Sequence, residues 1–139
     1  MLEITRGYVS EAGLDDRTSY IEGDMFEVPL RGPYDLIITS HVFHHFSEER
    51  CGQLLGRLAN ALQDDGRLAI QDFMAAGSRP ADEPFPRLFS VMMLVWTREG
   101  KAYSLGDYER MLVKGGFSPP EAQQPEGMPS RFLIAGPAR

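Results

Sequence analysis

The sequence has a single cysteine and no long apolar run. One thiol, Cys51, cannot form a disulfide within the chain, so a reducing compartment, the cytoplasm, is the expected location. The longest apolar stretches, such as 91–96, are far shorter than the roughly 20 residues that span a membrane. Residues 1–13 carry acidic side chains and no compact apolar run, so they are not expected to be a signal peptide.

The chain also lacks an excess of basic charge. Lysine and arginine number 14 against 20 acidic residues, which gives a net charge of −6 and a sequence pI near 5.0. No cluster of basic residues is present, so neither nucleic acid nor an anionic membrane surface is expected as a partner. The proportion of hydrophobic residues, 42%, is ordinary for a globular protein. A length of 139 residues suits one domain that can bury a hydrophobic core.

Hydrophobic periodicity predicts that helices alternate with strands. Apolar residues in 2–12 fit one face of a short helix, and Gly13 can end it. Residues 18–22 are predicted as a strand. The run YDLIIT at 34–39 is almost continuously apolar and rich in β-branched residues, so we expect a strand buried on both faces.

The middle of the chain continues this alternation. Ser47 can cap a helix with the clearest apolar stripe in the chain, and Gly66 is expected to close it. Residues 67–73 are predicted as a second buried strand. Residues 75–86, rich in proline, glycine and alanine, indicate a long loop, and long loops are often functional. Residues 88–96 are apolar nearly all round, so we expect a helix buried on several sides.

The last third carries a clear helix start. Ser104 and Asp107 have the spacing of a capping box, and Gly115 with Gly116 should stop the helix that follows. Residues 131–135 are the final predicted strand, with either a further strand or a loop before it. Helices alternating with buried strands predict an α/β sheet, which binds ligands at the carboxyl ends of its strands.

All three histidines fall within 41–45, directly after the predicted strand 34–39. An H-x-x-H-H pattern can bring two imidazoles to one ion, but a loop site needs further carboxylate or thiolate ligands. Cys51 lies on the buried helix stripe, and Glu48 and Glu49 are explained as first-turn acids that the helix dipole favours. No metal is therefore expected, whereas a metal-dependent hydrolase would carry bound zinc or iron.

Three segments carry a family pattern: GDMF at 23–26, YDLIITSHVFHHFSEE at 34–49 with DGRLAIQDF at 65–73, and TREGKAYSLGDYERMLVKGGF at 97–117. In this order they resemble the class I S-adenosylmethionine-dependent methyltransferases, in particular small-molecule O-methyltransferases of the plant phenolic and bacterial natural-product type. The resemblance implies a Rossmann-like sheet with a C-terminal antiparallel strand. It also implies S-adenosylmethionine as cofactor and a hydroxyl of a small aromatic or polyketide-like molecule as acceptor.

The resemblance assigns the adenine end of the cofactor site to Asp24, Met25 and Phe26. The aspartate would accept a hydrogen bond from the adenine amino group, and the methionine would pack on the adenine ring. The alternative for Asp24 is a turn at the end of a strand, where Gly-Asp is common. Ser40 matches a position that faces the methionine part of the cofactor.

His44 matches the general base of the plant-type members. The protein can help methyl transfer by removing the hydroxyl proton of the acceptor and by positioning the reactants. An imidazole, whose ordinary pKa is close to neutral pH, suits this proton transfer. Asp72 matches a carboxylate that fixes the imidazole. A second family carboxylate would fall at Ala102, so this chain departs from the pattern there. His45 is interpreted either as a structural residue or as one that contacts the catalytic side chains without touching the acceptor.

The remaining matches concern the acceptor pocket. His41 is interpreted as a residue that lines the loop after the strand 34–39. Met93 and Thr97 match pocket positions, and further candidates for the lining are Phe89, Met92 and Trp96. For each of these side chains a place in the plain hydrophobic core is an equally good interpretation.

One family motif is missing. No G-x-G occurs before Gly23, although the family has a glycine-rich turn after its first strand that lets the cofactor approach the backbone. The acidic residue after the second strand is absent too. Residues 2–14 resemble the helix after that second strand, so 1–139 is predicted as a partial catalytic domain. The glycine-rich motif and the N-terminal dimerisation domain of the family would then lie outside it.

This loss has a structural consequence. The family has the strand order 3-2-1-4-5-7-6, in which 18–22 corresponds to strand 3 and 34–39 to strand 4. Strands 1 and 2 lie between them in the family. Without these two strands, 34–39 would become an exposed apolar edge. Residues 18–22 could pair with 34–39, two chains could pair through their open edges, or the N-terminal part could be poorly ordered. Our hypothesis is association through the edge. The alternative function is a non-catalytic remnant or an interaction module that needs a complementary chain.

Overall fold

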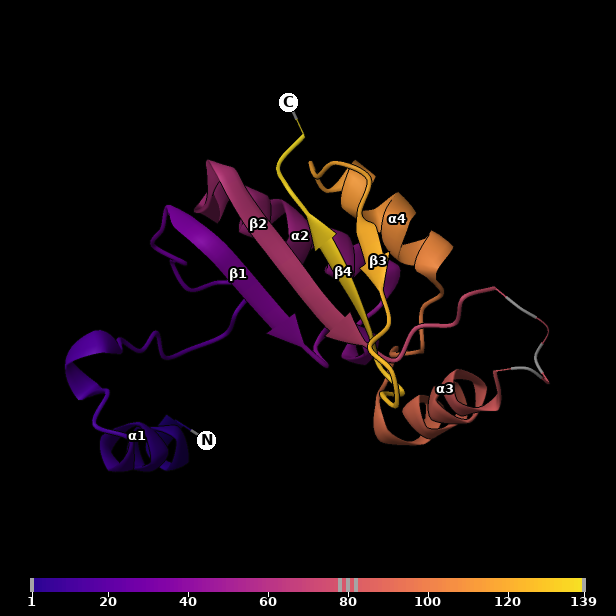
Figure 1. The fold of residues 1–139 in the computed structure, drawn as a ribbon, viewed down its shortest axis with the longest axis horizontal. Helices are drawn as coiled ribbons and strands as arrows, with labels where there is room; N and C mark the ends of the chain where they lie inside the picture. The colour runs from indigo at the N-terminus through magenta and orange to yellow at the C-terminus, as the bar shows by residue number, and fades with distance from the viewer. Residues whose placement is uncertain (1, 78, 80, 82, 139) are drawn as a thin grey trace. The chain divides into compact units, whose positions relative to one another are not determined.

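The computed structural model describes residues 2–77, 79, 81 and 83–138, and the chain divides into two units, Met1–Leu30 and Arg31–Arg139. Residues 78, 80 and 82 of the predicted loop lie outside the described residues. Figure 1 shows the elements of both units along the chain. Within the described residues, no helix combines the length and the apolar character needed to cross a membrane.

The first unit contains α1 (Leu2–Glu11) and a 3₁₀ turn, η1 (Asp15–Arg17). The predicted helix is confirmed, and Gly13 follows it with a φ of 66°, the left-handed conformation that glycine adopts without strain. The predicted strand at 18–22 is wrong. These residues form no strand in the structure, because no described strand offers them a ladder of hydrogen bonds.

The second unit contains a four-stranded sheet in the order β1-β2-β4-β3. Its strands are β1 (Tyr34–Ser40), β2 (Leu62–Asp72), β3 (Glu121–Gln123) and β4 (Arg131–Ala135). β1 and β2 are parallel, whereas β4 is antiparallel to both β2 and β3. The sequence-based expectation of a C-terminal antiparallel strand is thus confirmed, and a second strand, β3, precedes it.

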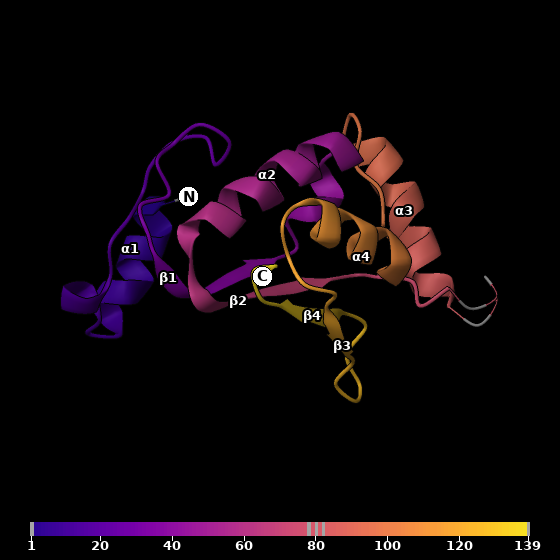
Figure 2. The same cartoon turned by 90° about the horizontal axis from the view of Figure 1, so that it is seen from above.

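Two helices, α2 (Glu48–Ala61) and α4 (Leu105–Lys114), lie together on one face of this sheet (Figure 2). Both begin with the predicted caps. The Ser47 hydroxyl accepts a hydrogen bond from a first-turn backbone N–H of α2, and Ser104 and Asp107 form a complete capping box at α4. These caps satisfy N–H groups that have no partner inside the helix.

Helix α2 ends earlier than predicted. Ala61 is its last residue, and Leu62 is already extended and pairs with Tyr34 in the sheet. Gly66 therefore lies inside β2 and does not close the helix. Its role is close approach, because a Cβ at this position would lie 2.8 Å from the Tyr34 carbonyl oxygen.

The sequence predicts strands that are buried on both faces. In the structure they are buried on one face only, so this prediction is wrong. Along β2, Leu68, Ile70 and Asp72 are buried at alternate positions, on the face that α2 and α4 cover. On β1, Leu36 and Ile38 are 54% and 67% exposed. β1 pairs with β2 along one side only among the described strands, so the prediction that it forms an exposed apolar edge is confirmed and direct pairing with 18–22 is not found.

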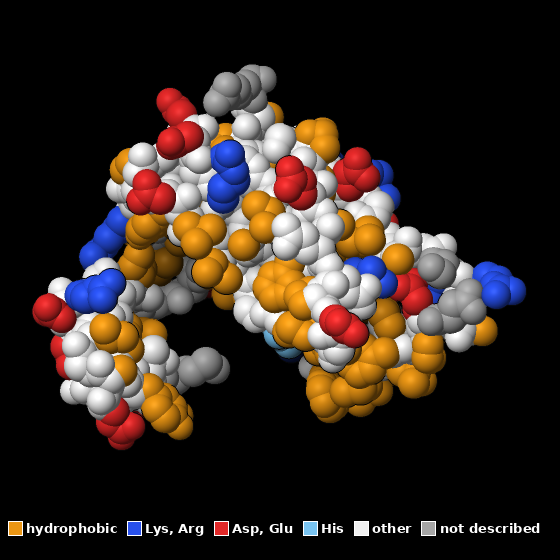
Figure 3. All heavy atoms as spheres, viewed as in Figure 1, with side chains coloured by type: hydrophobic (Ala, Val, Ile, Leu, Met, Phe, Trp, Pro, Cys, Tyr) orange, Lys and Arg blue, Asp and Glu red, His pale blue; other side chains and the backbone are white. Residues whose placement is uncertain are grey.

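Helix α3 (Pro84–Trp96) lies beyond the carboxyl ends of β1 and β2 (Figure 1). It begins four residues before the predicted start, with Pro84 in the first turn, where the missing N–H costs nothing. The expectation that it is buried on several sides is wrong. Only one side packs inward, while five apolar side chains are 59–78% exposed: Leu88, Val91, Leu94, Val95 and Trp96. Figure 3 shows this apolar surface, which no other described element of the second unit covers.

Candidate active site

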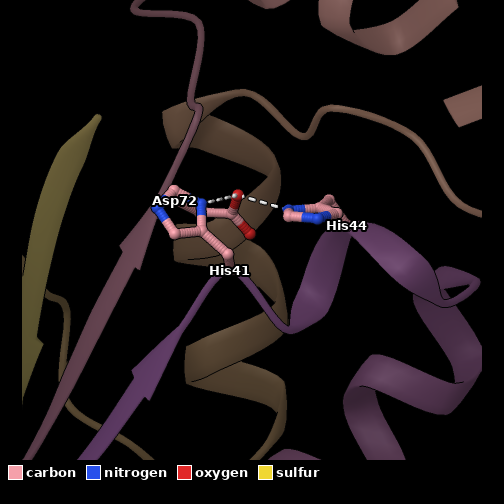
Figure 4. Close-up of side chains that lie close together, drawn as sticks. All are labelled: His41, His44 and Asp72. Atoms are coloured by element: carbon pink, nitrogen blue, oxygen red, sulfur yellow. Dashed lines mark hydrogen bonds and ion pairs between the residues drawn. The ribbon is translucent and has the colours of Figure 1, made fainter. Parts of the chain in front are cut away.

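The two parallel strands bring the candidate catalytic residues to one edge of the sheet. Ser40 pairs with Gln71 at the ends of β1 and β2, and the next N–H, that of His41, donates to the Gln71 carbonyl at 2.9 Å. The chain then turns into η2 (Phe43–His45), which carries His44 back toward Asp72 (Figure 4). Parallel strands end at the same edge, which explains why residues so far apart in sequence meet at this point.

His44 and Asp72 form a buried pair. The Nδ1 atom of His44 lies 2.6 Å from Oδ1 of Asp72, and the two residues are 4% and 1% exposed. This distance is that of a hydrogen bond between a charged and a polar group. Because an ionised carboxylate can only accept, the tautomer that makes this bond carries its proton on Nδ1, and Nε2 of His44 is then the nitrogen that can accept another.

Asp72 receives two further hydrogen bonds. The Tyr108 hydroxyl donates to Oδ2 at 2.7 Å, and the backbone N–H of Phe73 donates to Oδ1 at 2.8 Å. Burial by itself raises the pKa of Asp72, but the hydrogen bonds from His44, Tyr108 and Phe73 outweigh it and hold this pKa below its ordinary value. Asp72 is therefore ionised at neutral pH.

The other two histidines lie around this pair. His41 has a φ of 56°, and its Nδ1 atom is 3.8 Å from Oδ1 of Asp72, too far for a hydrogen bond. Among the described residues this buried nitrogen has no hydrogen-bond partner. The His45 ring lies 4.3 Å from that of His44, and burial together with the charge on His44 lowers the pKa of His45. His41 thus lies beside Asp72, and His45 lies against the ring of His44.

The cluster also offers ligands to a metal ion, since ligand atoms of His41, His44 and Asp72 lie within 4.8 Å of one another. Two ligand atoms of one tetrahedral zinc ion are about 3.3 Å apart, given bonds of about 2.0–2.1 Å. The His44–Asp72 distance of 2.6 Å is shorter. The arrangement therefore suits a shared proton better than an ion.

The candidate acceptor residues of α3 divide into two groups. Phe89 is buried and its ring meets the His44 ring edge-on at 4.8 Å, and Met93 is also buried. Met92 and Trp96 are 40% and 70% exposed, although the helical spacing places them beside Phe89. The Thr97 hydroxyl is used within the helix end, where it donates to the Met93 carbonyl at 2.7 Å.

The candidate cofactor residues lie in different units. Asp24, Met25 and Phe26 belong to the first unit, where the Asp24 carboxylate accepts a hydrogen bond from the Phe26 N–H at 2.9 Å, the turn geometry that was the alternative interpretation. The Met25 side chain is exposed. Ser40 belongs to the second unit, is exposed, and donates to the side-chain oxygen of Gln71 at 3.0 Å.

Two site residues were not predicted from the sequence. Phe73 follows Asp72 directly, and its ring lies 4.6 Å from that of Phe89 and 4.5 Å from that of His41. Its place after a strand-end carboxylate was a usable signal. Tyr108 offered none, because its position four residues after a helix cap also fits an ordinary core aromatic.

Comparison with known proteins decides the family. The O-methyltransferase domain family matches residues 2–118. The chain belongs to this family. The resemblance seen in the sequence is thereby confirmed, and the fold agrees, because a candidate O-methyltransferase from Nostoc punctiforme superimposes with a TM-score of 0.91 at 30% identity over 97% of this chain.

Curated relatives of this O-methyltransferase-family chain act in several contexts. Desmethyl-yatein O-methyltransferase from Sinopodophyllum hexandrum is 31% identical over 79% of the chain and 32% of its own length. L-tyrosine C(3)-methyltransferase from Streptomyces lavendulae is 32% identical over 95% of the chain and 37% of its own length. A family 2 O-methyltransferase protein from Planctomyces limnophilus, solved with apigenin, superimposes with a TM-score of 0.82 at 25% identity over 99% of the chain and 40% of its own. The chain therefore spans about a third of these curated relatives and two-fifths of the solved structures.

Proposed function

We propose that this chain is a partial catalytic domain, covering 1–139, of an S-adenosylmethionine-dependent O-methyltransferase, with His44 as general base. The observation that carries this proposal is the buried hydrogen bond between His44 and Asp72 at the carboxyl end of the parallel strands. A histidine held by a carboxylate is the arrangement needed to remove a proton from an acceptor hydroxyl.

The proton transfer follows from the geometry of the pair. Nδ1 of His44 donates to ionised Asp72, so Nε2 is the atom that takes the acceptor's proton. The imidazolium that results is stabilised by the Asp72 carboxylate, which stays ionised. S-adenosylmethionine, when bound, supplies an electrophilic methyl group to the acceptor oxygen. His44 is itself buried, so the acceptor has to reach it past the rings around it, among them Phe89, which contacts it edge-on.

The residues at GDMF suit part of the cofactor. Gly23 adopts a φ of 133° and its missing Cβ gives room to Val28, a close approach that keeps the turn tight. The Asp24 carboxylate offers an acceptor for an amino group, and the exposed Met25 offers an apolar face for a ring. Ser40 is our candidate for the methionine end. The sequence has no G-x-G motif before Gly23, so the fit concerns the adenine end.

The acceptor is proposed to be a small aromatic or polyketide-like molecule with a hydroxyl group. An aromatic surface is available beside the base: Phe89 meets both His44 and Phe73 edge-on, and Phe85 meets Phe73 at 4.9 Å. Such a surface favours a planar ring. We assign Met92, Met93, Trp96 and Thr97 to the same pocket on their family positions. The Planctomyces limnophilus protein was solved with apigenin, and this supports the same acceptor class.

Two measurements test this function. Calorimetry with S-adenosylhomocysteine should give binding at micromolar strength if the chain holds the cofactor by itself. Incubation with methyl-labelled S-adenosylmethionine and a panel of phenols should give a product methylated on oxygen. Methylation on carbon, or no transfer to any hydroxyl compound, would count against the proposal.

We further propose that two copies associate through the open edge of β1. The support is the unpaired edge with its exposed Leu36 and Ile38, which is a template for another strand. Light scattering over a concentration series should show dimers, and Ile38→Lys should shift them toward monomer. Monomer alone at every concentration contradicts this. Capture of a complementary chain at the edge, without self-association, would favour the alternative of an interaction module. A cytoplasmic location is proposed on the buried, reduced Cys51.

A further inference from the structure

Asp72 has a second side-chain partner besides His44. The Tyr108 hydroxyl, from the second turn of α4, donates to Oδ2 at 2.7 Å, whereas His44 holds Oδ1. Tyr108 and Asp72 are both buried, at 1% exposure each. The two carboxylate oxygens of Asp72 are thus bonded by two different side chains, His44 at Oδ1 and Tyr108 at Oδ2.

The direction of this hydrogen bond is defined. Burial, followed by the charge of Asp72, raises the pKa of Tyr108 well above its ordinary value, so the hydroxyl keeps its proton. An ionised carboxylate can only accept. Tyr108 is therefore the donor, and a phenylalanine in its place would leave Oδ2 without this bond.

The same region lacks a group that the family resemblance implies. Ala102 stands where a second carboxylate is expected, and alanine cannot hold an imidazole. We propose that Tyr108 is a positioning residue for His44: it fixes Asp72 so that Oδ1 faces Nδ1, and it sets how strongly Asp72 holds the proton on His44. This inference rests on the proposed role of His44.

The physical argument concerns the charge on Asp72. A hydroxyl donor stabilises the bare carboxylate more than a carboxylate already neutralised by an imidazolium. The pair of neutral imidazole and carboxylate therefore gains most from Tyr108, which lowers the pH at which the imidazolium of His44 gives up its Nε2 proton. A lower value leaves more of the base free near neutral pH.

Other titratable groups also face Asp72 and must be kept constant in a test. His41 lies 3.8 Å from Oδ1, and the charge of Asp72 acts on His45 and on Cys51. The Tyr103 ring lies 5.8 Å from that of Tyr108, and the Tyr103 hydroxyl donates to the Phe46 carbonyl and not to Asp72. Tyr103 is therefore a matched control for the loss of a buried hydroxyl.

The experiment is an NMR titration of the histidine rings in the 139-residue chain, with the His44 resonance assigned by comparison with His44→Gln. In Tyr108→Phe the titration midpoint of the pair should rise by about half a pH unit or more, because only the carboxylate loses its donor. In Tyr103→Phe it should stay within about 0.2 pH units of the original. Equal midpoints in all three proteins would overturn the inference and make Tyr108 a core aromatic.

A second substitution keeps the test sharp if Tyr108→Phe folds poorly. 3-Fluorotyrosine at position 108 retains the ring and is a stronger donor, so the midpoint should fall. A rise, or no change, contradicts the proposal. The titration is read without any methyl transfer. Shifts of the predicted sign with no turnover would therefore support Tyr108 and count against the proposed function alone.

Discussion

Nδ1 of His44 lies 2.6 Å from Oδ1 of Asp72, although 28 positions separate the two residues in the chain. The pair exists because β1 and β2 run in parallel and end in register, and because η2 turns the chain back toward the sheet. The carboxylate is buried and still ionised, since three donors compensate for its loss of water. This relationship supports the view of His44 as a base.

Asp72→Asn should weaken the fold as well as the site. At neutral pH we expect a loss of about 3 kcal/mol in the free energy of unfolding, because a buried, fully hydrogen-bonded charge is removed while its donors stay buried. Urea unfolding measures this. Asp65→Asn, on an exposed carboxylate of β2, is the control and should change the value by less than about 0.5 kcal/mol.

The same variant has a defined pH dependence. The pKa of Asp72 is lowered in the folded chain, so its stabilisation is present above the ordinary carboxyl pKa of 3.8 and disappears as the pH falls through the lowered value. The part of the stability difference between the original chain and Asp72→Asn that comes from the ionised carboxylate should therefore shrink below about pH 4. A difference that persists unchanged in strong acid would contradict the ionised state.

Neighbouring residues of α3 should respond in opposite ways. Met93 is 1% exposed and Leu94 is 75% exposed. Met93→Ala is expected to cost about 2–4 kcal/mol in the free energy of unfolding through the cavity it leaves, and Leu94→Lys about 0.5 kcal/mol or less. Equal losses in chemical unfolding would show that the outward side of α3 is packed in solution.

Cys51 should be unreactive while the chain is folded. Burial raises the pKa of its thiol to about 11, so little thiolate exists at neutral pH. Alkylation with iodoacetamide at pH 7.5 should proceed only as fast as the chain unfolds, and should become rapid in denaturant. Rapid labelling under native conditions would contradict the burial of this side chain.

The sequence predicted well wherever the signal was local. The caps at Ser47 and Ser104 and the helix stop at Gly13 were all predicted correctly, and each depends on a few adjacent residues. The edge position of 34–39 was predicted from the strand order of the family that the sequence resembles, and it is confirmed. The meeting of His44 with Asp72 was predicted from the family resemblance, and the parallel register supplies its physical cause.

Burial was predicted less well, because it depends on what lies on the other side of an element. The apolar runs of β1 and α3 look like core segments, but their exposed faces have no neighbour among the described residues of the second unit. The early end of α2 came from the pairing of Leu62 with Tyr34, a contact invisible to helical periodicity. Tyr108 escaped prediction for the same reason, since its partner lies 36 positions away.

The most direct test of the account is methyl transfer to a phenolic hydroxyl by His44→Gln and His45→Gln, compared with the original chain. The two rings are adjacent, but only His44 is bonded to Asp72. His44→Gln should lower the rate by about 10²–10⁴-fold, the usual contribution of a general base, and His45→Gln should stay within a few-fold. Turnover by His44→Gln close to that of the original chain would contradict the central claim and leave His44 as a wall of the pocket.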